Sequence, residues 1–222
     1  MNQRHELSRR SFVKASVLAA ALPLGAALAG CAPASDGGSA AASSSAAASA
    51  AASSSAQAVA AGGEDVLVAF FSATGNTREV AEKIAAHFGA DLFEIEPVEP
   101  YTEADLAYGD DASRTSRERV DANRAVELVE VTPPDFDAYS TVFGGYPIWW
   151  GGASWVVDAF VTGNDFTGKT VVPFCTSGSS PIGSSGDALA LMAGSGDWVG
   201  GARFAAGASE SEVAAWVDGL GL

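Results

Sequence analysis

The sequence predicts an α/β domain in which a doubly wound, five-stranded parallel sheet of order 2-1-3-4-5 carries helices on both faces. Three observations lead to this prediction. Segments that are apolar and strand-like alternate along the chain with segments of helical spacing. Three of the strand-like segments are continuous apolar runs, as expected for parallel strands covered on both faces. The second strand-like segment alternates apolar and acidic residues, which places it at an edge of the sheet.

The N-terminal region, residues 1–31, has the pattern of an export signal. The pair Arg9-Arg10 precedes an Ala/Leu-rich stretch, residues 15–28, that is too short for a comfortable membrane span. The pair resembles a twin-arginine signal, whose pathway exports folded proteins. The letters LAGC that end at Cys31 resemble a bacterial lipobox, which implies cleavage before Cys31 and acylation of its thiol. The alternative is an unprocessed apolar tail.

A Ser/Ala-rich tract, residues 32–63, follows and is predicted to be a flexible linker, because it holds almost nothing that could be buried. Residues 64–222 form the predicted domain and carry 8 Lys and Arg against 25 Asp and Glu, a net charge of −17. This charge excludes binding to nucleic acid and to anionic lipid. A lipid on Cys31 would therefore be the membrane attachment, at the outer face of the cytoplasmic membrane. Cys175 is the only cysteine of the domain, so an intramolecular disulfide is excluded after processing.

The first half of the domain begins with a buried strand. Residues 65–72 are rich in Val and Phe and predict a central strand. Residues 76–89 predict a helix, because its apolar residues recur four apart and Gly89 ends it. Residues 91–97 predict the edge strand, since Phe and Ile alternate with Glu before a closing proline.

The second half repeats the alternation. The apolar runs 140–150 and 169–177 predict interior strands, and 201–207 predicts a short last strand. Helical spacing predicts three further helices, in residues 154–163, 183–194 and 209–220. The last of these begins with Ser209 and Glu212 at the spacing of a capping box.

The turn after the first strand predicts an anion site. Parallel strands place their ligands beyond their carboxyl ends, at the point between the first and third strands where the winding reverses. There, a Gly-containing turn that enters a helix offers free backbone N–H groups and hydroxyl side chains, so it can hold a phosphate without Lys or Arg. The alternative is that Thr74 or Asn76 only caps the helix. The predicted phosphate-binding residues are Ser72, Ala73, Thr74, Gly75, Asn76 and Thr77.

Two further loops leave the third and fourth strands at the same end. The first, GGYPIWWGGAS, carries Trp149 and Trp150 where the strand stops. Adjacent side chains of a strand point to opposite faces, so the two indoles are not expected to be buried at the same place. We therefore expect one of them to contact a ligand, and the sequence does not say which one. The second, CTSGSSPIGSS, is rich in glycine and backbone donors and could surround a polar ring edge. Its alternative role is that of a flexible connector.

Together the three segments resemble the flavodoxin family, and in particular the flavodoxin-like group that carries GYPIWWG after the third strand. The resemblance covers the chain from about Asp65 to the C-terminus. It implies FMN as cofactor, with the phosphate on Ser72 to Thr77 and the flavin ring between the other two loops. The implied ring contacts are Pro147, Ile148, Trp149, Trp150, Gly151 and Gly152 in the first loop, and Cys175, Thr176, Ser177, Gly178 and Ser179 in the second.

One departure from the family bears on function. A typical electron-transfer flavodoxin covers its flavin with an aromatic side chain from the second loop, and residues 175–185 hold none. The outer face of the flavin is therefore expected to be open, or covered by a Trp of the first loop. The resemblance implies an FMN protein that carries electrons between redox partners, proteins or small molecules, outside the cytoplasm. The alternatives are an FMN-dependent NAD(P)H or quinone reductase, and a non-enzymatic lipoprotein that has lost its flavin.

The remaining reactive residues are given structural roles. Cys175 at the end of a buried strand is expected to be an inert apolar side chain, with a redox role as the alternative. The arginines of the long segment between residues 97 and 131 are expected to lie on a solvated helix face and to pair with nearby acids. Contact with NADPH or a redox partner is the alternative for them. No catalytic side chain and no metal-ligand set is predicted. The arginines of the segment between residues 97 and 131 are Arg114, Arg117, Arg119 and Arg124.

Overall fold

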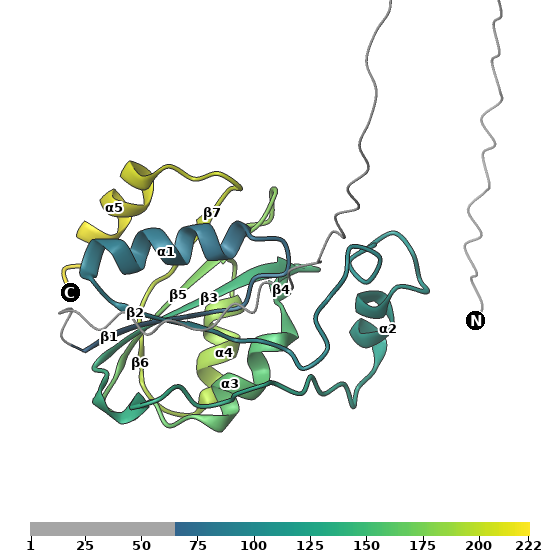
Figure 1. The fold of residues 1–222 in the computed structure, drawn as a ribbon, viewed down its shortest axis with the longest axis horizontal. Helices are drawn as coiled ribbons and strands as arrows, with labels where there is room; N and C mark the ends of the chain where they lie inside the picture. Colours follow the sequence, from purple (N-terminus) through teal and green to yellow (C-terminus); the bar gives the residue numbers. More distant parts are fainter. Residues whose placement is uncertain (1–64) are drawn as a thin grey trace, which may run out of the picture. The chain divides into compact units, whose positions relative to one another are not determined.

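The structure is a computed structural model, and it describes residues 65–222 (Figure 1). The export signal, the lipidation residue Cys31 and the Ser/Ala-rich linker lie outside the described residues. None of the helices in the described part of the chain has the length and apolar character needed to cross a bilayer.

One mixed sheet organises the domain, in the order β2-β1-β3-β5-β6. The strands pair in parallel, except that β4 runs antiparallel to β3. The acidic second strand lies at the edge, as predicted. The strands are β1 (Val66–Phe70), β2 (Asp91–Glu94), β3 (Thr141–Trp149), β4 (Gly152–Ala153), β5 (Thr170–Thr176), β6 (Asp197–Trp198) and β7 (Ala202–Phe204).

The predicted count of five strands is wrong, because the sheet has seven. One extra strand arises where β3 folds back on itself through a two-residue turn into β4. The other arises because the position next to β5 is filled by two short strands in succession. β6 pairs with the start of β5 and β7 pairs with its end.

Pro173 in the middle of β5 explains the break between β6 and β7. Alternate residues of a strand point their N–H and C=O groups to the same neighbouring strand. On the side of β5 that faces β6 and β7, the oxygen of Val171 accepts from the N–H of Val199, and the N–H of Ser177 donates to the oxygen of Phe204. Pro173 lies between them and has no N–H to donate. A Cβ at Gly201 would lie 2.1 Å from the Pro173 oxygen, so the chain passes close to the proline without a side chain.

Helices cover both faces of the sheet, as predicted (Figure 1). α1 and α5 contact each other on one face, and α3 and α4 contact each other on the other. The segment predicted as one helix over 154–163 divides into a 3-10 turn, Trp155–Val157, and α3. The helices are α1 (Asn76–Phe88), α2 (Arg114–Val120), α3 (Asp158–Gly163), α4 (Ser185–Ala193) and α5 (Glu210–Asp218), with a further 3-10 turn at Phe136–Ala138.

The helix ends follow their sequence signals. Gly89 ends α1 with φ 66, and its N–H donates to the oxygen of Ala85. The Ser209 hydroxyl accepts from the N–H of Glu212, at 3.2 Å, and so caps α5. The end of α1 and the Ser209 cap are as predicted, while the return bond from the Ser209 N–H to the Glu212 side chain, which would complete the capping box, is not among the hydrogen bonds of the described residues.

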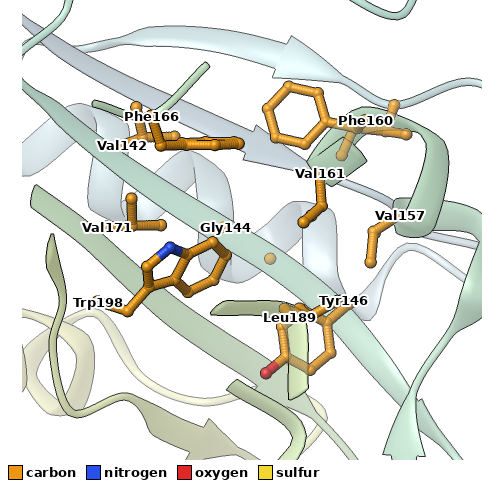
Figure 2. A pocket seen from close by; sticks show the side chains of 12 residues that line it. Val142, Gly144, Tyr146, Val157, Phe160, Val161, Phe166, Val171, Leu189 and Trp198 are labelled. Carbon is orange, nitrogen blue, oxygen red and sulfur yellow. The ribbon is translucent and has the colours of Figure 1, made fainter. Parts of the chain in front are cut away.

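Two apolar cores lie on the two faces of the sheet. The core under α3 and α4 contains a small cavity of about 20 Å³, which is room for about one water molecule (Figure 2). Its walls are apolar and include Phe160, Phe166, Leu189 and Trp198. The cavity lies within the core and is separate from the three loops predicted to bind a ligand.

Neighbouring glycines of β3 face opposite cores. A Cβ at Gly144, which borders the cavity in Figure 2, would meet no atom within 4 Å. A Cβ at Gly145 would lie 2.3 Å from the ring of Phe174, which is fully buried. Gly145 therefore lets Phe174 pack directly against the backbone of β3.

Candidate functional site

The three predicted ligand loops leave the sheet at one edge. In the register of the sheet, Phe70 at the end of β1 lies opposite Gly145, and Pro147 lies opposite Thr176 at the end of β5. The turn into α1, the β3–β4 turn and the loop after β5 therefore begin side by side, near β4 in Figure 1. This is the carboxyl edge, where open α/β sheets bind their ligands.

The turn before α1 presents a row of free backbone donors. Within residues 65–222, the N–H groups of Ala73, Thr74, Gly75, Asn76 and Thr77 donate to no acceptor. They surround the N-terminus of α1, where the helix dipole adds partial positive charge. Arg78 follows the turn, and Glu94 already neutralises its charge. The turn therefore leaves amides free at a helix N-terminus, which is what the predicted anion site requires.

The side chains of the same turn bond among themselves. The Asn76 amide donates to the Thr74 hydroxyl at 3.0 Å, and the Ser72 hydroxyl accepts from the N–H of Arg78 at 3.2 Å. The residue at the N-cap position is Gly75, with φ 88, and it has no side chain to cap the helix. Capping by Thr74 or Asn76, the alternative explanation of this turn, is therefore wrong.

Thr77 lies at the inner end of this turn. Its side chain is buried, and its hydroxyl lies 2.8 Å from the hydroxyl of Thr176 at the end of β5. This bond joins the α1 turn to the start of the second loop. It uses one of the two hydroxyl hydrogens, so the pair retains one hydrogen for another acceptor.

The β3–β4 turn explains the position of the two tryptophans. Trp150 and Gly151 have φ values of 46 and 83, as in a two-residue type I′ hairpin turn. A left-handed conformation costs a non-glycine residue about 1–2 kcal/mol, so Trp150 is held there by its contacts. Because Trp150 has left the strand geometry, the expectation that the two indoles point to opposite faces is wrong.

Trp149 and Trp150 both pack on Trp155, yet they differ in exposure. Trp149 is buried and meets Trp155 edge-on, with ring centroids 4.9 Å apart. Trp150 is 36% exposed and stacks on Trp155 at 5.8 Å with an interplanar angle of 16°. Trp149 is thus a core residue, and Trp150 is the indole that solvent can reach.

The second loop is buried where it leaves β5 and exposed to solvent a few residues later. The side chain of Cys175 is fully buried, and burial raises the pKa of its thiol to about 12, so it is an inert apolar residue at neutral pH. Any ligand contact at Cys175 must come from its backbone. Arg203 donates to the Ser177 hydroxyl at 3.0 Å and to the Ser177 oxygen, and so fixes the loop where it leaves β5. Gly178 and Ser179 are exposed beyond that point.

The segment around α2, whose arginines were expected mainly to face solvent, also lies at this edge. Glu118 of α2 accepts three hydrogen bonds: from the Tyr101 hydroxyl at 2.7 Å, from Trp155 Nε1 at 2.8 Å and from Arg114 Nε at 2.7 Å. Burial and the hydrogen bond to Glu118 raise the pKa of Tyr101. Tyr101 in turn packs on Trp149, at a ring distance of 5.2 Å. One carboxylate therefore ties α2 to the tryptophan cluster.

The arginines around α2 only partly follow the prediction of a solvated face paired with acids. Arg114 pairs with Glu118, and Arg117 donates to the oxygen of Ala112. Arg119 and Arg124 instead lie over the rings of Trp150 and Trp155.

Glu118→Gln is expected to destabilise the protein by about 1–3 kcal/mol, because an amide cannot accept from three donors as the carboxylate does. The free energy of unfolding in urea, followed by tryptophan fluorescence, measures the change. Glu103→Gln is the matched control, since it removes the same charge from an exposed residue of the same segment. Equal stabilities of the two variants would contradict the role given to Glu118.

In the described residues, no group of three or more His, Cys, Asp or Glu side chains is placed to hold a metal ion. One acid with a shifted pKa is Asp158 at the start of α3, near Arg124. Burial raises the pKa of its carboxyl to about 6, and the nearby Arg124 partly offsets this.

Comparison with known proteins identifies the family. A model of the flavodoxin family matches residues 65–220. A candidate flavoprotein from Bacteroides eggerthii is 39% identical, with a TM-score of 0.65, over 72% of this chain and 99% of its own. One from Bacteroides uniformis is 38% identical, with the same TM-score, over 71% and 99%.

A flavoprotein from Lactobacillus acidophilus, solved in complex with FMN, is 21% identical, with a TM-score of 0.50, over 69% of this chain and 99% of its own. At that identity the likeness concerns the fold alone. Curated proteins give no significant match. The family model covers the described domain and the two Bacteroides structures share its fold, so the chain belongs to the flavodoxin family.

Proposed function

We propose that the domain binds FMN and carries electrons with it. The observation that carries this proposal is the row of five backbone N–H groups, Ala73 to Thr77, that have no acceptor within residues 65–222 and surround the start of α1. A phosphate monoester is the ligand that best fits such a row. Bound FMN supplies the electron-transfer chemistry, and the protein binds and orients it.

The three loops divide the binding. Ser72 to Thr77 hold the phosphate through backbone N–H groups, with the Thr74 hydroxyl as a further donor. Pro147 to Gly152 and Cys175 to Ser179 flank the ring from either side. Of the two candidate indoles, Trp150 is the one that solvent can reach and therefore the one available to the flavin.

The test is the visible spectrum of the purified protein. The spectrum of bound oxidised flavin, and the release on heating of a compound that comigrates with FMN, are the expected results. A colourless, folded protein that also fails to quench the fluorescence of added FMN would exclude the proposal. It would favour the alternative of a lipoprotein that has lost its flavin.

A reductase that uses NAD(P)H or a quinone is the second candidate. It is favoured by the absence of any aromatic residue in 175–185, which leaves no ring of the second loop to cover the flavin. Rapid mixing of the FMN-loaded protein with NADH and with NADPH distinguishes the candidates. Bleaching of the flavin within the time of a catalytic turnover indicates a reductase, and its absence an electron carrier.

The proposed location is the outer face of the cytoplasmic membrane, with a lipid on Cys31 as the anchor. The expected result for Cys31→Ser is a shift of the protein from the membrane fraction to the soluble fraction, because the acyl attachment is lost. Fractionation and labelling with a radioactive fatty acid measure it, and Cys175→Ser is the matched control. Retention of Cys31→Ser on the membrane would contradict the anchor.

A further inference from the structure

Half of the positive charge of this acidic domain lies in a single short stretch. Of the 8 Lys and Arg in residues 64–222, four fall between residues 114 and 124. The cations elsewhere in residues 65–222 have polar partners. Those cations and their partners are Arg78 with Glu94, Lys83 with the Ala208 oxygen, Lys169 with the Asp137 and Tyr139 oxygens, and Arg203 with Ser177.

Two arginines of the stretch differ from all of these. Within residues 65–222, the side chains of Arg119 and Arg124 make neither a hydrogen bond nor an ion pair, although the Arg124 charge lowers the pKa of the Asp158 carboxyl. The guanidinium carbon of Arg119 lies 5.1 Å from the ring centroid of Trp150, and that of Arg124 lies 5.0 Å from the ring centroid of Trp155. Both arginines are exposed, so their N–H groups remain available to a ligand.

The two indoles join these arginines into one surface. Trp150 stacks on Trp155, and Tyr108 lies against the edge of Trp150 at 5.0 Å. Tyr108 is 50% exposed and Trp150 is 36% exposed. We call this surface, made of Tyr108, Arg119, Arg124 and Trp150 with the buried Trp155 beneath them, the Arg–Trp ledge. Trp150 belongs to the β3–β4 turn, so the ledge adjoins the carboxyl edge of the sheet and its three loops.

We propose that the Arg–Trp ledge binds a small planar aromatic anion, a carboxylate or sulfonate, which exchanges electrons with the flavin. This inference rests on the proposed function, because it names the class of electron donor or acceptor for the same site. The guanidinium fork is complementary to a carboxylate or sulfonate, and the partly exposed rings of Tyr108 and Trp150 offer apolar surface beside it. The net charge of −17 disfavours anions over most of the domain, so apart from the amide turn before α1 the ledge is where an anion can approach.

The first test measures binding without any redox reaction. The purified full-length protein is titrated with naphthalene sulfonate and with the neutral naphthalene methanol, by calorimetry and by quenching of tryptophan fluorescence. We expect the sulfonate to bind more tightly, and Arg119→Gln to weaken it about tenfold, the effect of losing one charged contact. Arg117→Gln is the matched control, because it removes the same charge from the same helix away from the indoles, and its effect should stay below about twofold.

Three results would overturn the proposal. The first is equal affinity for the sulfonate and the neutral compound. The second is an equal loss in Arg117→Gln and Arg119→Gln, which would indicate diffuse electrostatic attraction instead of a defined site. The third is a tenfold loss of FMN affinity in Arg119→Gln, which would place Arg119 in the flavin site.

The second test asks whether the anion is an electron acceptor. Protein reduced with dithionite is mixed with naphthoquinone sulfonate or with neutral menadione. Two electrons from the reduced flavin and two protons convert either quinone to its hydroquinone. We expect Arg119→Gln to lower the preference for the sulfonate, as a ratio of second-order rates, about tenfold, and an unchanged ratio would overturn the electron-acceptor role. If FMN does not bind at all, the proposed function fails, while the naphthalene titration still decides whether the ledge holds anions.

Discussion

Thr74→Asp should weaken FMN binding by about 100-fold or more. Thr74 is exposed in the turn before α1, between N–H groups that await an anion, so an added carboxylate would stand beside the phosphate dianion. Two unit charges about 4 Å apart near a protein surface repel by about 4 kcal/mol, and solvent screening leaves a substantial part of this. Quenching of FMN fluorescence on titration gives the dissociation constant.

Thr74→Asn is the matched control, because it keeps the size and the polar character of aspartate without its charge. The folded protein should tolerate both changes, since an acid near a helix N-terminus is favourable and either side chain can accept from Asn76. The melting temperature checks this point. Similar FMN affinities for the two variants would mean that the phosphate lies elsewhere, and the assignment of this turn would fail.

Gly145→Ala is expected to destabilise the domain by about 3 kcal/mol. The new Cβ would stand 2.3 Å from the Phe174 ring, in the middle of a central strand, where neither backbone nor ring has space to move. For a protein of this size, such a loss lowers the melting temperature by about 6–12 °C. Differential scanning calorimetry measures it, and FMN affinity at low temperature shows whether the site survives in the folded fraction.

Gly144→Ala is the opposite case, one residue earlier in the same strand. Its Cβ would meet no atom within 4 Å and would partly fill the cavity beside α3 and α4. We expect a gain of about 0.5–1 kcal/mol, because alanine loses less backbone entropy than glycine in a strand and adds apolar contact. Equal melting temperatures for the two alanine variants would show that the packing of β3 differs from that described.

The sequence predicted those parts of the fold that depend on local pattern. The apolar runs of β1, β3 and β5 and the glutamate alternation of β2 placed the interior and edge strands correctly, because burial on one or both faces leaves a direct trace in the residues. The same holds for the amide-rich turn before α1, which depends on a Gly and on its position between a strand and a helix.

The parts that the sequence did not predict depend on contacts between distant segments. The division of the last strand needs both the missing N–H of Pro173 and the passage of Gly201 beside it, and neither has meaning until the two strands are neighbours. The left-handed turn at Trp150 goes against the usual preference for glycine or asparagine, and so gave no signal. The packing of α2 against Trp155 through Glu118 spans 37 residues.

The direction of β1 has a consequence for how the protein meets other molecules. The chain enters the described domain at Asp65, at the amino end of that strand, while the amide-rich turn begins at its carboxyl end, after Phe70. Five residues of extended chain span roughly 17 Å, so the point of attachment and the cofactor loops lie on opposite rims. An attachment upstream of Asp65 would therefore join the domain at the rim opposite the three loops. Under the proposed function, a redox partner would therefore approach the rim opposite Asp65.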